Sequence, residues 1–197
     1  MSSNEGELSS IERGMLLHIA TDSIHTGLRE GHASSPDLET LPDALQQKAA
    51  CFVTLHHREQ LRGCIGSLEP REPLAQNVAE NAFNAAFRDP RFPELTAVEL
   101  ADLELDISVL GAPQTVSFRD EADLVAQLQP GRDGLILEVG GRRGTFLPSV
   151  WGSLPDAEEF LRQLKQKAGL PADFWSADIR VMRYGTESFG ARFVDVE

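Results

Sequence analysis

The chain has 197 residues, of which 41% are hydrophobic, so it can bury one sizeable core and fold as a single domain. Its 31 Asp and Glu residues outnumber its 18 Lys and Arg residues, and the net charge of −13 disfavours binding to nucleic acids and anionic membranes. No apolar stretch approaches the roughly 20 residues of a membrane-spanning helix. The start of the chain lacks the basic and apolar regions of a signal peptide, so we expect a cytoplasmic protein.

The N-terminal segment predicts a disordered start followed by a helix. Residues 1–8 are polar and acidic, and we expect them to be disordered. Ser9 and Glu12 have the spacing of a capping box, and apolar residues recur at helical intervals after them. We expect this helix to end at about Gly27.

A β-hairpin is predicted next, with strands at residues 51–57 and 61–66. Each strand carries one of the two cysteines, Cys51 and Cys64. If a three-residue turn brings Thr54 opposite Cys64, the two thiols point to opposite faces of the hairpin, because side chains alternate along a strand. We therefore predict two free thiols, which agrees with a reducing compartment.

The middle of the chain predicts a second helix and a half-buried strand. Residues 74–87 place four apolar side chains on one stripe, and residues 89–93 end the helix because they contain two prolines. Thr96 and Glu99 have the spacing of another capping box. Residues 103–109 then alternate between apolar and polar types, as in a strand with one face on the core.

The C-terminal part continues this mixture of helices and strands. It predicts a helix over 120–128, a hairpin of 135–139 and 142–147 joined by Gly140-Gly141, a helix from about Pro155 to Gly169, and strands over 179–184 and 192–196. This order predicts an α+β fold in which helices pack against a largely antiparallel sheet.

The segment Leu61-Arg62-Gly63-Cys64-Ile65-Gly66 is the strongest candidate for a functional site. In an extended strand Arg62 and Cys64 point to one face, and a guanidinium beside a thiol stabilises the thiolate, which is the nucleophilic form. Gly63 and Gly66 allow a ligand or another stretch of backbone to approach closely. The alternative is a packed strand cysteine beside glycines that mark a bulge.

A histidine on the preceding strand is a candidate base for this thiol. In the register assumed above, His56 faces Arg62 and lies diagonal to Cys64. Cys64, Arg62 and His56 are therefore the candidate catalytic residues.

Asp89 and Arg91, with Gly63 and Gly66, are candidate ligand-binding residues. The planar guanidinium of Arg91 can bind a carboxylate or a phosphate in a polar cleft. The alternative is a salt bridge within a loop.

We expect neither a metal ion nor a cofactor. His18, His25 and His32 recur every seven residues, which on one helix would separate each pair by about 10 Å, too far to share a metal ion. The Gly140-Gly141 turn is not followed by a helix N-terminus, so we do not expect a phosphate-binding loop there.

Residues 61–66 resemble the LRGCIG signature of the AMMECR domain family, also called AmmeMemoRadiSam system protein A. The resemblance extends from about residue 11 to residue 189 and includes further segments. These are Phe52-Val53-Thr54-Leu55, Phe87-Arg88-Asp89-Pro90-Arg91-Phe92, Gly144-Thr145-Phe146-Leu147-Pro148 and Lys167-Ala168-Gly169-Leu170.

The resemblance implies a two-lobed α+β fold with a cleft lined in part by the signature. It also implies two partners, a Memo-like protein and a radical-SAM protein, but it supplies no reaction. Two hypotheses remain open. In the first, the chain is an accessory protein that docks on these partners around the signature. In the second, it is an enzyme for a small anionic metabolite or a modified residue, with Cys64 as nucleophile or redox group and Arg91 orienting the substrate.

Overall fold

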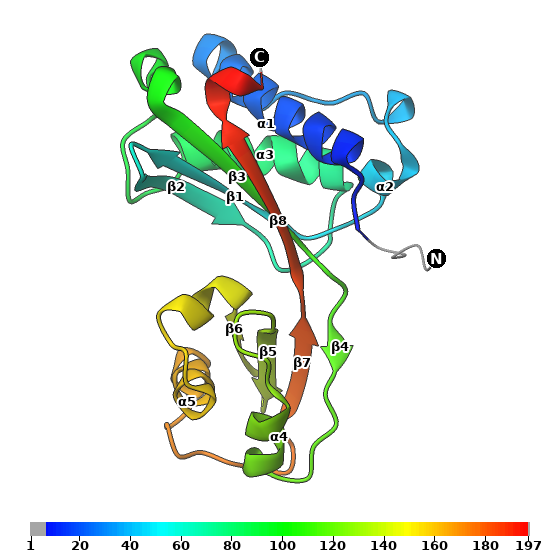
Figure 1. Ribbon diagram of the computed structural model, residues 1–197, viewed down its shortest axis with the longest axis vertical. Helices are drawn as coiled ribbons and strands as arrows, with labels where there is room; N and C mark the ends of the chain where they lie inside the picture. The colour runs from blue at the N-terminus through cyan, green and yellow to red at the C-terminus, as the bar shows by residue number, and fades with distance from the viewer. Residues whose placement is uncertain (1–6, 197) are drawn as a thin grey trace. The chain divides into compact units, whose positions relative to one another are not determined.

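A computed structural model describes residues 7–196 of the chain. The chain divides into two compact units, each with its own sheet and hydrophobic core (Figure 1). The first unit takes in the residues up to Leu110 and from Glu187 onward, and the second is formed by residues 111–186. The predicted α+β class with antiparallel strand pairing is confirmed, although the strands form two sheets where we expected one.

The first unit combines a sheet in the order β2-β1-β3-β8 with helices on one of its faces (Figure 1). Its strands are β1 (Cys51–His57), β2 (Gln60–Gly66), β3 (Leu103–Leu110) and β8 (Thr186–Arg192). Its α-helices are α1 (Ser10–Glu30), α2 (Asp43–Gln46) and α3 (Leu74–Phe87). Short 3-10 helices are η1 (Leu38–Thr40), η2 (Ala97–Asp102) and η4 (Phe193–Asp195).

Helix α1 begins at the predicted capping box, in which Ser9 and Glu12 exchange hydrogen bonds between side chain and backbone. It ends later than predicted, because Gly31 takes the left-handed conformation of a C-cap (φ 78°) and its N–H donates to the carbonyl of Gly27. The disorder predicted for residues 1–8 falls mostly on residues 1–6, outside the described residues. Leu8 donates its N–H to the Glu187 carboxylate at 3.1 Å.

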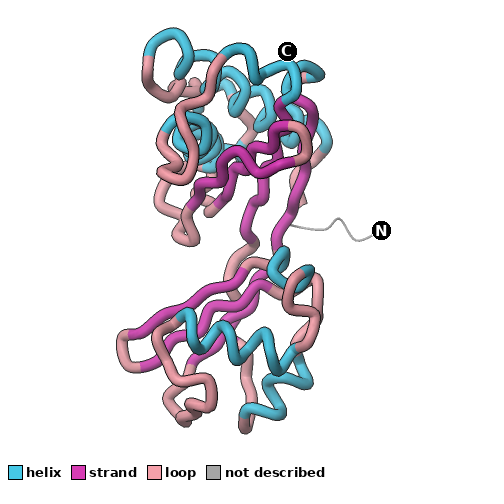
Figure 2. Tube along the Cα trace, turned by 90° about the vertical axis from the view of Figure 1, so that its left-hand side faces the viewer, coloured by secondary structure: helices cyan, strands magenta, loops and turns pink. Residues whose placement is uncertain are grey.

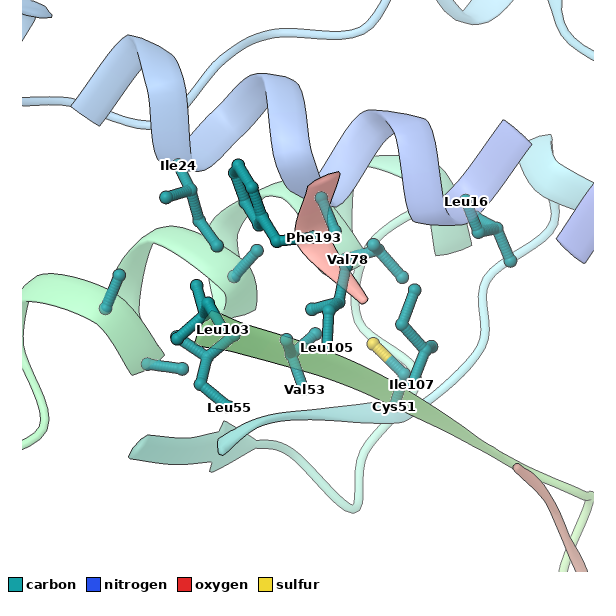
Figure 3. Close-up of a cluster of buried hydrophobic side chains, with 14 of the residues drawn as sticks. Leu16, Ile24, Cys51, Val53, Leu55, Val78, Leu103, Leu105, Ile107 and Phe193 are labelled. Atoms are coloured by element: carbon teal, nitrogen blue, oxygen red, sulfur yellow. The ribbon is translucent and has the colours of Figure 1, made fainter. Parts of the chain in front are cut away.

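Strand alternation divides the first sheet into a core face and a polar face. Figure 3 shows Val53, Leu55, Leu105 and Ile107 pointing from β1 and β3 towards α1 and α3. All four are fully buried. Because neighbouring side chains along a strand point in opposite directions, the residues between them lie on the other face, which carries the candidate site.

The second unit has a sheet in the order β4-β7-β5-β6. Its strands are β4 (Gln114–Thr115), β5 (Gly134–Val139), β6 (Arg142–Phe146) and β7 (Arg180–Tyr184). Its helices are α4 (Glu121–Gln127), α5 (Ala157–Lys167) and the 3-10 helix η3 (Pro148–Gly152). Figure 2 shows α5, the longest helix of this unit, along one face of the sheet, where Phe160 and Leu164 are buried in the core with Leu135 and Leu137.

The predicted strand over residues 192–196 is wrong. Strand β8 precedes it, and the following residues form η4, whose Phe193 is buried in the core of the first unit. The sequence of β8 lacks the apolar alternation that marks a half-buried strand, and none of its side chains is fully buried. Within residues 7–196, no helix combines the length and the apolar character needed to cross a membrane.

Candidate functional site

The hairpin of β1 and β2 closes in a tighter turn than predicted. Arg58 (φ 52°) and Glu59 (φ 64°) both take the left-handed conformation, so the turn has two residues, and His57 pairs with Gln60. A two-residue turn with positive φ at both positions matches the twist of the strands it joins.

A β-bulge restores the register further along the hairpin. His56 pairs with Leu61, whereas Leu55 pairs with Gly63, so Arg62 is the additional residue on β2. The prediction that His56 faces Arg62 is therefore wrong, because the shorter turn moves the first two pairs by one residue.

Beyond the bulge, Thr54 lies opposite Cys64, as predicted. The Thr54 hydroxyl donates to Cys64 Sγ at 3.3 Å, and Cys64 is partly exposed.

Cys51 lies in the core, where burial raises the pKa of its thiol to about 12. The two cysteines are free, as predicted.

The edge of β2 is held by side chains from the segment after α3. Strand β2 is the first in the sheet order, so within residues 7–196 one side of it lacks a neighbouring strand. There the Cys64 N–H donates to Asp89 Oδ2 at 3.0 Å, and Arg91 Nη2 donates to the Cys64 carbonyl at 3.3 Å. Asp89 and Arg91 also form an ion pair at 2.6 Å. The two predicted ligand-binding side chains therefore bind the backbone of the signature.

This ion pair has an electrostatic consequence. Asp89 is buried, and the hydrogen bond from Arg91 holds the pKa of its carboxyl well below the usual range. Asp89 is therefore ionised at neutral pH and remains an acceptor for the Cys64 N–H.

Arg62 is bound by an acidic residue of η2. Its Nε lies 2.6 Å from Glu99 Oε1, and its Nη2 lies 3.3 Å from Glu99 Oε2. The hydrogen bond from Arg62 lowers the pKa of Glu99 to about 2. Glu99 is itself held by the predicted capping box with Thr96. The positive charge that we expected Arg62 to offer to Cys64 is thus balanced by Glu99.

Phe92 lies within reach of both arginines of this region. Its ring centroid is 6.0 Å from the guanidinium carbon of Arg62 and 5.4 Å from that of Arg91. Arg62 is 8% exposed, and its Nη1 is buried without a hydrogen-bond partner in the described part of the chain.

The glycines of the signature are needed for packing. A Cβ at Gly63 would lie 2.1 Å from the Ala85 carbonyl oxygen in α3, and one at Gly66 would lie 2.4 Å from the Cys51 carbonyl oxygen. Both positions therefore favour the reading in which another stretch of backbone approaches closely.

The polar face of the sheet adds a residue that the sequence did not single out as a partner of His56. His56 Nδ1 lies 3.4 Å from Asp106 Oδ2 on β3. Asp106 is also opposite Thr54, so Cys64, Thr54 and Asp106 form one row across β2, β1 and β3. A Cβ at Gly190 would lie 2.2 Å from Asp106 Oδ1, so β8 approaches this carboxylate closely. Sequence reasoning placed Asp106 on a polar strand face but could not give the pairing of β1 with β3.

Among residues 7–196, no group of three or more His, Cys, Asp or Glu side chains is arranged to hold a metal ion. The polar face itself presents the Cys64 thiol, the Thr54 hydroxyl, the His56 imidazole and the Asp106 carboxylate.

Comparison of the sequence with known proteins identifies a family. The sequence model of the AMMECR1 family matches residues 17–189, which is most of the chain. The chain belongs to the AMMECR1 family. The resemblance drawn from the LRGCIG segment is thereby confirmed.

Relatives of this AMMECR1-family chain occur in archaea and bacteria. A protein of Methanothermobacter thermautotrophicus is 41% identical over 92% of this chain and 95% of its own length. One of Thermotoga maritima is 38% identical over 84% of this chain and 91% of its own length. The crystal structure of an uncharacterized protein from Pyrococcus horikoshii matches with a TM-score of 0.81 and 33% identity over 93% of both chains.

Proposed function

We propose that this AMMECR1-family chain is an accessory protein that docks on partner proteins through the surface around residues 61–66. The partners are those that the family resemblance implies, a Memo-like protein and a radical-SAM protein. The observation that carries the proposal is the internal pairing of the signature strand: its polar groups bind Asp89, Arg91 and Glu99 of the same unit.

Two exposed apolar residues flank the ion pair that holds this strand to η2. Leu61 is 41% exposed and Val98 is 87% exposed, and each is the chain neighbour of one member of the Arg62–Glu99 ion pair. We call Leu61, Arg91, Phe92 and Val98 the signature surface. A surface whose backbone is already held loses little conformational entropy on binding, which favours protein docking.

Co-purification of tagged chain with the two partners tests this proposal. Leu61→Lys with Val98→Lys places two charges on the signature surface and is expected to abolish co-purification. Ile11→Lys is the matched control, because Ile11 is also an exposed apolar residue (69%) but lies on α1. Equal co-purification of the double variant and the control would contradict docking at this surface.

A second candidate function is supported by the contact between His56 and Asp106. In a cysteine-dependent enzyme for a small anionic metabolite or modified residue, Cys64 would be the nucleophile, His56 the base and Asp106 the group that orients the imidazole. Arg91, whose side chain is 53% exposed, would orient the anionic substrate.

The rate of Cys64 alkylation by iodoacetamide at pH 7.5 separates the two candidates. If His56 acts as the base, His56→Gln slows the reaction by about tenfold or more, within the range of general base catalysis. His57→Gln is the matched control on the next residue of β1. Equal rates in both variants and the unsubstituted chain would leave docking as the function of this surface.

A further inference from the structure

We propose a binding site for a small phosphorylated metabolite in the second unit, at the tip of the hairpin formed by β5 and β6. A pocket of about 550 Å³ lies there. Its lining consists of Glu138, Val139, Gly140, Gly141, Arg142, Arg143, Asp178 and Arg180. Pockets of about 300–1,000 Å³ are the usual size for small-molecule sites.

Strand pairing places two of the arginines on either side of one carboxylate. Glu138 on β5 lies opposite Arg143 on β6 and opposite Arg180 on β7, so the three side chains form one row on the same face of the sheet. Arg143 Nε contacts Glu138 Oε1 at 3.3 Å. The carboxylate is therefore engaged with Arg143, on the side of the row away from Arg180.

Two guanidinium groups in the lining lack a carboxylate partner among residues 7–196. Arg180 is exposed, and in the described part of the chain its side chain has no ion pair or hydrogen bond. Arg142 Nη1 donates to the carbonyl of Gly169, which is neutral and follows the end of α5. This hydrogen bond positions the Arg142 side chain without cancelling its charge.

The lining as a whole carries more positive than negative charge. Three arginines against Glu138 and Asp178 leave the lining with a net charge of +1, whereas the whole chain carries −13. A local excess of arginine on an acidic protein attracts anions, and the planar guanidinium donates paired hydrogen bonds to phosphate oxygens.

The turn adds backbone donors beside these side chains. Gly140 (φ 55°) and Gly141 (φ 76°) form it, and a Cβ at either position would meet no atom within 4 Å. Open space above both glycines lets an anion approach the turn. The site differs from a phosphate-binding loop, because arginine side chains would hold the anion in place of a helix N-terminus.

Titration with inorganic pyrophosphate, followed by the backbone amide signals of Gly140 and Gly141 in NMR spectra, tests the proposal. We expect saturable shifts at both glycines. Arg180→Gln should weaken binding by about tenfold, the loss expected when one charge-assisted hydrogen-bond donor is removed. Glu138→Gln should tighten binding, because it removes the carboxylate that competes with phosphate for Arg143.

Two controls make the test decisive. Arg132→Gln removes the same charge from an exposed arginine of the second unit that is not part of the lining, and it should leave binding unchanged. Citrate should bind more weakly than pyrophosphate if the site prefers phosphate oxygens. The proposal is overturned if the glycine signals do not saturate, if Arg132→Gln weakens binding as much as Arg180→Gln, or if citrate binds as tightly.

Discussion

The Asp89 carboxylate accepts a hydrogen bond from the Cys64 backbone N–H at 3.0 Å, at an edge where a neighbouring strand would otherwise supply the acceptor. Arg91 completes the arrangement by donating to the Cys64 carbonyl. A side-chain ion pair thus satisfies both backbone groups of the central signature residue. This arrangement protects an exposed strand edge from pairing with another chain.

Removing the Asp89 carboxylate should destabilise the first unit. Asp89→Ala leaves the Cys64 N–H without an acceptor and Arg91 without its partner, and we expect the free energy of unfolding to fall by about 1–3 kcal/mol. Urea denaturation at pH 7 measures the change. Asp102→Ala is the control, because it breaks the exposed ion pair with Arg58, which contributes little. Equal losses in both variants would show that the strand edge does not depend on Asp89.

The Arg62–Glu99 ion pair should make stability depend on pH. The pKa of Glu99 in the folded state, about 2, lies below the ordinary value of 4.5. The stabilisation by the ion pair is therefore fully present above pH 4.5 and is lost as the pH falls towards 2. Glu99→Gln should lower stability by about 3 kcal/mol at pH 7, because it leaves a buried unpaired guanidinium. Urea denaturation at several pH values should show the gap to the unsubstituted chain narrowing below pH 4.5. A gap that stays constant with pH would contradict the assignment.

A double substitution separates the ion pair from its burial cost. Arg62→Met with Glu99→Met removes both charges, so no unpaired charge remains in the protein interior. We expect this double variant to be more stable than Glu99→Gln at pH 7 in the same denaturation assay. The reverse order would mean that the pair itself, and not the unpaired guanidinium, dominates the loss.

Two glycine substitutions should have opposite effects on stability. Gly63→Ala places a Cβ against the Ala85 carbonyl, which belongs to the backbone of α3 and cannot move aside. We expect a loss of several kcal/mol or failure to fold. Gly14→Ala adds a methyl group where no atom lies within 4 Å in α1 and should stabilise the chain by about 0.5–1 kcal/mol. Thermal unfolding of the two purified variants measures both changes, and similar melting temperatures would refute the packing argument.

The two thiols should react at very different rates with iodoacetamide in the folded chain. Cys51 is fully buried, and burial raises the pKa of its thiol to about 12, so it is protonated and inaccessible at pH 8. Cys64 is partly exposed. Mass spectrometry of peptides should find the label on Cys64 alone in native buffer and on both cysteines in urea. Native labelling of Cys51 would contradict the assignment of that side chain to the core.

The sequence by itself determined the local elements, because their signals lie within a few residues of one another. The capping boxes at Ser9 and Thr96, the Gly140-Gly141 turn and the alternation along β3 all predicted structure that the chain adopts. The LRGCIG segment also identified the family. Each of these features depends on short-range backbone geometry or on a contiguous motif.

Only the tertiary structure decided which side chains meet. Glu99 is 37 residues from Arg62, and Asp89 is 25 residues from Cys64. Such contacts depend on how α3, η2 and β2 pack, and no periodicity in the sequence encodes that packing. The bulge at Arg62 is a further example, since the left-handed conformation of Arg58 and Glu59 shortened the turn and moved His56 away from its expected partner. Register and long-range pairing follow from the lowest free energy of the whole fold, and for this reason the chemistry of the signature could not be assigned from residues 61–66 alone.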